Sequence, residues 1–192
     1  MSISKKIFNS FLEMKSIYAI AAIAMLLALR VVLGFFANAT LPFFGNSVKL
    51  SAAFLPIAVT AAMFGPFPAA LVGALGDIVS FIIAPTGMYF PGFTISGFIT
   101  GLIYGLFLYK NNATLKNVII AWFVNALTVE TFINAYWLYM LYSGGTGKTY
   151  IAYLITRYVS EAVKCVPEIL LIFTFGKLAK NIKIPKLQKQ RR

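Results

Sequence analysis

Four charged residues in the last third of the sequence recur at the spacing of one helical face. They are Arg157, Glu161, Lys164 and Glu168, and on an α-helix they fall within about 60° of one another. Such a stripe can form a ladder of i,i+3 and i,i+4 ion pairs. Alternatively, Arg157 at its beginning can supply a cation to a binding pocket, and the sequence leaves both readings open.

A second polar group lies on the preceding apolar run. Glu130, Asn134 and Trp137 are spaced i, i+4 and i+7, so a helix presents them as one column of carboxylate, amide and aromatic surface. This column rises towards the outer end of the predicted helix. Arg30 and Asp77 lie at comparable depths in their own apolar runs. Either they pair with each other, or Arg30 is free to bind an anion.

The residue types present exclude several kinds of chemistry. The chain has no histidine and a single cysteine, Cys165, so it lacks the commonest general base and metal ligand, and we expect no metal site. Asp77 is the only aspartate, whereas an intramembrane aspartyl protease needs two. We therefore expect this protein not to be an enzyme.

The stretch SGGTGKTY, residues 143–150, resembles the end of a phosphate-binding loop. That loop requires the pattern G-x-x-x-x-G-K-[ST] between a strand and a helix. Here the first glycine would fall at Tyr142, and the run before it has the length of a membrane helix. We expect an external turn at this stretch rather than an ATP site.

The composition indicates a membrane protein. Hydrophobic residues make up 60% of the chain and charged residues only 11%, compared with about 25% charged in globular proteins. A charged side chain that faces lipid costs roughly 2.5 to 3.5 kcal/mol. The charged residues inside the apolar runs are therefore expected to face the interior of a helix bundle.

The lengths of the apolar runs predict the architecture, because a membrane-spanning helix needs about 20 residues. We expect an all-α integral membrane protein with six transmembrane helices, forming a single domain over residues 1–192. Two shorter helices share the segment 48–84 and are separated by a proline-rich turn at 65–68. The other expected spans are 16–37, 92–109, about 116–142 and about 148–180.

The positions of the basic residues predict the orientation. Six spans place nearly all loop and terminal lysines and arginines on one side, which the positive-inside rule assigns to the cytoplasm. Both termini, including a basic tail over about 181–192, are then cytoplasmic, and this placement argues against nucleic acid as a partner. The basic residues of that side are Lys5, Lys6, Lys15, Lys110, Lys116 and those within 177–192, and the opposite side receives Lys49 and Lys148.

Small residues repeat on two of the predicted helices. Gly97, Gly101 and Gly105 recur every four residues, which predicts close packing against a neighbouring helix. Ala24 and Ala28 have the same spacing on the first predicted span. Their face can receive either a neighbouring helix or a partner protein.

Three stretches carry a resemblance to a known family. They are GNSVKLSAAFLPIAVTAAMFGPFPAALVGALGDIVSF, MYFPGFTISGFITGLIYGLFLYK and NAYWLYMLY, and together they resemble the folate-type substrate-binding (S) components of energy-coupling factor (ECF) transporters. The resemblance implies a six-helix protein of the cell membrane that binds a vitamin with high affinity near its outer face. It also implies a complex with a transmembrane coupling subunit and two cytoplasmic ATPase subunits, so that the partners use ATP and this chain needs no cofactor.

The resemblance also assigns roles to particular residues. Ala24 and Ala28 match the small-residue motif by which the first helix docks on the coupling subunit. Asn134 and Trp137 match the N-x-x-W motif of the fifth helix. Arg30 stands where folate-type members often place a polar residue.

The chemistry of these residues fits folate. A flat pterin can stack on Trp137 or Tyr136, and the amide of Asn134 can donate and accept at the pterin edge. The glutamate carboxylates of folate can meet a basic side chain. The expected substrate-binding residues are Arg30, Lys49, Phe90, Phe93, Asn134, Trp137 and Arg157, with Lys148 as a further basic candidate. Riboflavin or pantothenate remain alternatives to folate, and an intramembrane enzyme is the alternative of another class.

Overall fold

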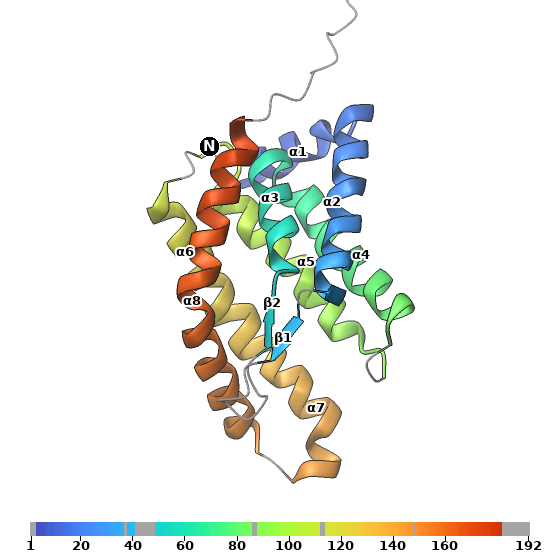
Figure 1. Cartoon of the computed structure of the whole chain (residues 1–192), viewed down its shortest axis with the longest axis vertical. Helices are drawn as coiled ribbons and strands as arrows, with labels where there is room; N and C mark the ends of the chain where they lie inside the picture. Colours follow the sequence, from blue (N-terminus) through green and yellow to red (C-terminus); the bar gives the residue numbers. More distant parts are fainter. Residues whose placement is uncertain are drawn as a thin grey trace, which may run out of the picture.

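The computed structural model describes residues 3–36, 38–40, 49–85, 88–111, 114–147 and 149–181, and within these ranges it is a bundle of helices with one short β-ribbon (Figure 1). In chain order the elements are α1 (Ile3–Glu13), α2 (Ile17–Phe36), β1 (Asn38–Thr40), β2 (Lys49–Ser51), α3 (Phe54–Phe64), α4 (Pro66–Ile83), α5 (Pro91–Leu108), α6 (Leu115–Asn125), the π-helix η2 (Ala126–Ile133), α7 (Asn134–Thr146) and α8 (Tyr150–Asn181).

A helix lies within each of the predicted spans. In the described part of the chain, four helical stretches are long and apolar enough to cross a membrane, namely α2, α4, α5 and the continuous rod of α6, η2 and α7. Helix α3 is apolar but has only 11 residues. Helix α8 has 32 residues and carries the charged stripe that begins at Arg157.

The predicted span that begins at residue 48 is wrong at its N-terminal end. Residues 49–51 form β2, which pairs antiparallel with β1, with Asn38 opposite Ser51. Helix α3 therefore begins only at Phe54. This pairing is a contact between segments distant in sequence, and an apolar run by itself does not distinguish a short strand from the first turns of a helix.

The turn predicted at 65–68 is confirmed. Gly65 adopts φ +94°, a left-handed conformation that glycine tolerates, and it separates α3 from α4. Pro66 occupies the first turn of α4, where its missing N–H costs no hydrogen bond.

The glycine repeat on α5 is confirmed as a packing face. A Cβ at Gly97 would lie 2.6 Å from the carbonyl oxygen of Gly73, and one at Gly101 would lie 2.3 Å from that of Ala69. The backbones of α4 and α5 therefore approach more closely than any larger side chain would permit. This close pair forms the wall against which the candidate site is built.

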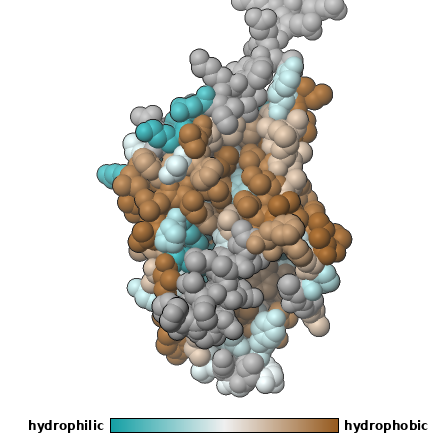
Figure 2. Space-filling view, in the orientation of Figure 1, coloured by the Kyte–Doolittle hydropathy of each residue, from teal (hydrophilic) through white to brown (hydrophobic). Residues whose placement is uncertain are grey.

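The exterior of the bundle is strongly apolar. Large hydrophobic side chains are widely exposed, including Met25 at 68% and Ile82 at 72%. In Figure 2, hydrophobic residues cover much of the described surface around the middle of the molecule. In the interior, small residues such as Ala61 and Ala69 pack with larger ones such as Tyr104 and Ile172. Such an exterior suits a lipid environment, because water would not tolerate so large an apolar surface.

Candidate functional site

A polar cavity of about 250 Å³, here called the deep cavity, lies inside the bundle. Helices α2, α3, α4, α5, η2 and α8 all contribute side chains to it. Its charged lining residues are Arg30, Asp77, Glu130, Glu161, Lys164 and Glu168, and its neutral polar ones include Ser96, Thr100, Tyr104, Asn125 and Asn134. The prediction that the charged residues of these runs face the bundle interior is therefore confirmed for all of them except Arg157.

A second cavity of about 490 Å³, here called the mouth cavity, lies towards the end of the bundle opposite α1. Aromatic residues dominate its lining, among them Phe35, Phe81, Tyr89, Phe90 and Phe93. Asp77 and Phe93 line both cavities. The two cavities therefore adjoin, with an aromatic space leading to a polar one.

Arg30 reaches from α2 towards α4. Its Nη1 donates to the carbonyl oxygens of Val72, at 2.6 Å, and of Gly73. Gly76 leaves the space that the guanidinium fills, since a Cβ there would lie 2.4 Å from Nη1. The buried Nε of Arg30 has no hydrogen-bond partner. Arg30 is thus fixed by backbone carbonyls and still has a donor available beside the deep cavity.

Asp77 is not held by Arg30. Both residues are described, and no ion pair joins them; the carboxylate Oδ2 of Asp77 instead accepts from the hydroxyl of Thr94 at 2.6 Å. That hydroxyl also lies 2.9 Å from the Tyr89 hydroxyl. The two side chains therefore form no direct ion pair, which was one of the two sequence-based alternatives, although the charge of Asp77 still acts on the nearby guanidinium of Arg30.

Trp137 belongs to an aromatic cluster beside the mouth cavity. Its ring centroid lies 5.5 Å from that of Phe90 and 5.3 Å from that of Tyr136, and Phe90 and Phe93 are 6.0 Å apart. The indole N–H donates to the Ser96 hydroxyl at 3.1 Å. Trp137 itself lines neither cavity, so it supports the residues that do.

The helix that carries Asn134 changes its winding next to the deep cavity. Residues Ala126–Ile133 form the π-helix η2, and α7 begins at Asn134. Segments of this kind are rare and occur often at functional sites. Glu130 lies within the segment, and its carboxylate accepts from the Asn134 amide at 3.0 Å.

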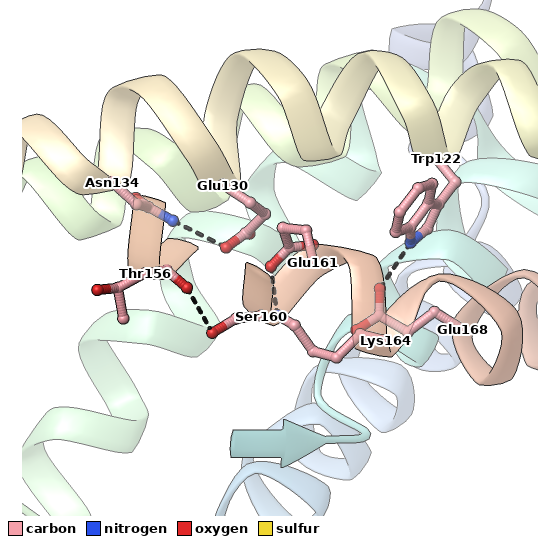
Figure 3. A network of polar contacts seen from close by, with 8 residues as sticks. All are labelled: Trp122, Glu130, Asn134, Thr156, Ser160, Glu161, Lys164 and Glu168. Atoms are coloured by element: carbon pink, nitrogen blue, oxygen red, sulfur yellow. Dashed lines mark hydrogen bonds and ion pairs between the residues drawn. The ribbon is translucent and has the colours of Figure 1, made fainter. Parts of the chain in front are cut away.

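The charged stripe on α8 forms only part of the predicted ladder (Figure 3). Glu161 and Lys164 form an i,i+3 ion pair. Glu168 instead accepts from the Trp122 indole of α6 at 2.7 Å. Arg157 lines neither cavity, so these contacts do not place it in a pocket.

The deep cavity contains more hydrogen-bond acceptors than donors. Among the described side chains it holds four carboxylates against one guanidinium and one ammonium group. The side-chain oxygens Oδ1 of Asn125 and Asn134 are buried and have no hydrogen-bond partner. Buried polar atoms are usually paired, so these oxygens indicate a ligand or solvent that donates hydrogen bonds.

The expected binding residues are distributed unevenly over this site. Arg30, Phe93 and Asn134 line the deep cavity, and Phe90 lines the mouth cavity. Lys49 belongs to β2 by its backbone, but its side chain lies outside the described part of the chain, as does the whole of Lys148. Ala24 and Ala28 are exposed on the surface of α2.

Five polar lining residues escaped the sequence reasoning, and one of them is Ser51 at the end of β2. Ser96, Thr100 and Tyr104 line the deep cavity at intervals of four residues along α5, one position ahead of the glycines that pack on α4. This repeat was readable from the sequence as a polar edge beside the packing face. Asn125 gave no such signal, because its exposure to the cavity depends on where the helix becomes a π-helix.

The stretch SGGTGKTY does not have the surroundings of a phosphate loop. Helix α7 continues to Thr146, and α8 begins at Tyr150, so a helix stands where that motif requires a strand. The predicted turn is shorter than expected, because residues 143–146 still belong to α7 and only the residues before Tyr150 separate the two helices. Lys148 lies outside the described part of the chain, and the external position of this turn stays a prediction.

Comparison with known proteins agrees with this geometry. Residues 18–175 match the family described as ECF transporter, substrate-specific component. The folate transporter FolT of Clostridium novyi is 32% identical over 171 residues, which cover 89% of this chain and 95% of that protein. FolT of Leuconostoc mesenteroides is 29% identical over 143 residues, covering 73% and 75% of the two chains.

A solved structure is also similar. The crystal structure of FolT bound with folic acid superposes with a TM-score of 0.72 at 29% identity, covering 88% of this chain and 94% of that one. Together with the apolar helices, the family match makes this chain a multi-pass membrane protein. The chain belongs to the family of substrate-specific components of ECF transporters.

Proposed function

We propose that this protein binds folate in the two adjoining cavities and delivers it to a transporter complex. The observation that carries the proposal is the polar deep cavity behind an aromatic mouth, in a chain whose similar proteins are folate transporters. The similar solved structure holds folic acid. Membership of the family leaves the vitamin open, whereas these relatives favour folate over riboflavin and pantothenate.

The distribution of charge supports one orientation of the ligand. A pterin presents an amino group and a ring N–H, which the acceptors of the deep cavity, such as Glu130 and Asn134, can receive. The glutamate end of folate is anionic, and the excess of carboxylates in the deep cavity would repel it. We infer that the pterin enters the deep cavity and the glutamate remains in the mouth cavity. Arg30 then faces the pterin rather than the glutamate carboxylates.

The proposed topology has six spans with both termini in the cytoplasm. Helices α3 and α8 are the two further spans. Helix α3 is short but packs among neighbouring helices, and the charged residues of α8 at positions 161, 164 and 168 face the deep cavity rather than lipid. The described lysines outside the bundle interior gather at the end where α1 lies, which favours that end as cytoplasmic. The mouth cavity then opens towards the outside of the cell.

The proposed partners are a transmembrane coupling subunit and two cytoplasmic ATPase subunits. Ala24 and Ala28 are exposed on α2, and small residues on an exposed face permit close approach of another helix. We infer that ATP is used only by the partner subunits, so that this chain binds its substrate without a cofactor and without catalysis.

The experiment is a ligand-binding measurement on the purified chain. Ligand retained through detergent purification is identified by mass spectrometry, and folate, pteroate, riboflavin and pantothenate are then titrated by calorimetry. The proposal expects tight folate binding, with pteroate retaining most of the affinity because the pterin end is the buried one. Tight binding of riboflavin or pantothenate without folate binding would contradict it. Binding of ATP would contradict the assignment of ATP use to partner subunits.

A further inference from the structure

The N-terminal helix α1 faces the bundle with its polar side. Lys6 and Ser10 are its buried residues, at 9% and 0% exposure. On a helix they lie on the same side as Glu13. The opposite side carries Phe8, Phe11 and Leu12, with Ile7 at its edge, and all four are exposed.

The polar side of α1 pairs with the ends of two other helices. The Lys6 ammonium donates to the carbonyl oxygen of Leu106 at 2.7 Å, near the C-terminal end of α5. The Ser10 hydroxyl accepts from the backbone N–H of Phe67 at 2.9 Å, in the first turn of α4. Helix ends present such unpaired donors and acceptors, and a cation is favourable at a C-terminus.

These contacts fix α1 across one end of the bundle (Figure 1). The Tyr109 hydroxyl adds a longer contact of 3.4 Å to Glu13. Because the polar side is used for docking, most of the apolar side points away from the bundle, and Phe8 is 64% exposed and Leu12 40%. Phe11 is 50% exposed and also packs edge-on against Phe67 of α4, with ring centroids 5.4 Å apart. A surface helix of a soluble protein has the reverse arrangement, with its apolar stripe towards the core.

The apolar side of α1 continues onto a surface that belongs in lipid. Only Met14, Lys15 and Ser16 separate α1 from α2, which is apolar enough to cross a membrane. The first residues of α2 are also exposed, with Ile17 at 70% and Ile20 at 52%. The outward face of α1 thus adjoins the outer surface of a transmembrane helix.

Exposed lysines surround this end of the bundle. They lie on α1 itself, in the α1–α2 link, after α5, at the start of α6 and near the end of α8. Glu13, the one acidic residue of α1, is engaged by Tyr109. An apolar helix face beside such a group of cations is complementary to an anionic membrane surface. The lysines are Lys5, Lys15, Lys110, Lys116 and Lys177.

We propose that α1 is an in-plane membrane helix. Its face of Ile7, Phe8 and Leu12, with the exposed part of Phe11, lies among the acyl chains just below the headgroups, and the surrounding lysines contact anionic headgroups. The polar contacts to α4 and α5 couple this helix rigidly to the bundle. The lipid surface therefore holds the protein at a set depth at the end opposite the mouth cavity.

The test measures the depth of α1 in the whole protein without any partner subunit. Phe8→Cys in a Cys165→Ser background carries a spin label, and the protein is reconstituted into phosphatidylcholine vesicles with or without phosphatidylglycerol. Collision rates with oxygen, which concentrates in lipid, and with a water-soluble nickel chelate are compared. Met25→Cys on the exposed face of α2 is the lipid reference, and Gly144→Cys at the opposite end is the water reference.

The proposal expects the label at position 8 to collide with oxygen more than with nickel, as at position 25. It also expects the label at position 8 to lie deeper in vesicles that contain phosphatidylglycerol than in those that do not. In the double variant Lys5→Gln, Lys15→Gln, the depth of the label should no longer depend on phosphatidylglycerol. Nickel accessibility equal to that at position 144 would overturn the proposal. So would protection that develops only after the coupling and ATPase subunits are added, because the face would then be a protein contact. Unchanged melting temperatures confirm that the labelled variants are folded.

Discussion

The amide of Asn134 is oriented by Glu130, one turn earlier on the same helical rod. Its Nδ2 donates to Oε2 of Glu130 at 3.0 Å, and its Oδ1 is left buried without a partner. Asn134 lies at the junction where the π-helix η2 gives way to α7. Because the carboxylate of Glu130 binds the amide nitrogen of Asn134, the amide oxygen is the atom left to accept a hydrogen bond from a ligand in the deep cavity.

This relationship predicts the effect of removing the amide. Asn134→Ala should leave pterin donors without their partner, a loss of about 1 to 3 kcal/mol, or about 5- to 150-fold in affinity. Folate titration by calorimetry measures it. Thr128→Ala is the matched control, because Thr128 is exposed on the same π-helix and bonds only to the carbonyl of Val124. An equal loss in both variants would assign the effect to the helix rather than to the amide.

The contacts of Arg30 predict its contribution to stability. Arg30→Met removes the donors to Val72 and Gly73 and should lower the melting temperature, since hydrogen bonds to a charged group contribute about 1.5 to 3 kcal/mol. Adding Asp77→Asn should restore little of that stability, because the two side chains form no direct ion pair and Thr94 donates to that carboxylate. Thermal unfolding of the single and double variants measures both effects. Recovery in the double variant would show that the two charges neutralise each other after all.

Two helical glycines with opposite surroundings give a third prediction. Gly101→Ala would place a Cβ 2.3 Å from the backbone of Ala69, so α4 and α5 must separate and the melting temperature should fall, by an amount equivalent to about 1 to 3 kcal/mol. Gly176→Ala meets nothing within 4 Å and should leave stability unchanged or raise it, because alanine favours a helix by about 1 kcal/mol over glycine. A similar fall in both variants would contradict the packing explanation.

The interior charges were the part of the site that the sequence predicted well. Lipid penalises an unpaired charge strongly, so Glu130, Glu161, Lys164 and Glu168 had to face the bundle, and they line the deep cavity together. The packing face at Gly101 was equally readable, since its period matches the helix. Both inferences depend only on residue type and helical spacing.

The partners of those side chains could not be predicted in the same way. Glu168 pairs with Trp122 on another helix, and Asp77 pairs with Thr94 on α5, because the relative heights of the helices decide which groups meet. The β-ribbon and the docking of α1 likewise depend on contacts between distant segments. Lys6 would count as an exposed terminal lysine by its sequence position, yet it is buried against Leu106.

The exposed alanines of α2 give a prediction that separates binding from transport. Ala24→Trp or Ala28→Trp should abolish folate uptake by cells that contain the whole complex, because bulk there prevents close approach of a partner helix. Folate binding by the purified chain should remain, since neither residue lines a cavity. Leu29→Trp, at an exposed position on the same helix, is the control and should retain uptake. Normal assembly of both alanine variants with the coupling subunit would exclude this face as the docking surface.

The aromatic cluster gives the last prediction. It distinguishes a role of Trp137 in holding the residues that line the cavities from direct stacking of the pterin on an aromatic ring of the cluster. Trp137 packs on Phe90, which lines the mouth cavity, and donates to Ser96, which lines the deep cavity. Trp137→Ala removes both supports and should weaken folate binding by about 2 kcal/mol or more, roughly 30-fold. Trp137→Phe keeps a ring against Phe90 and loses only the hydrogen bond to Ser96, so its loss of folate affinity should be smaller.

Tyr136→Ala is the control, because Tyr136 packs on Trp137, lines neither cavity and is 46% exposed. Calorimetric titration of the three variants should rank their losses in affinity as Trp137→Ala, then Trp137→Phe, then Tyr136→Ala. A larger loss in Tyr136→Ala than in Trp137→Ala would place the pterin on the outer ring of the cluster and outside the two cavities.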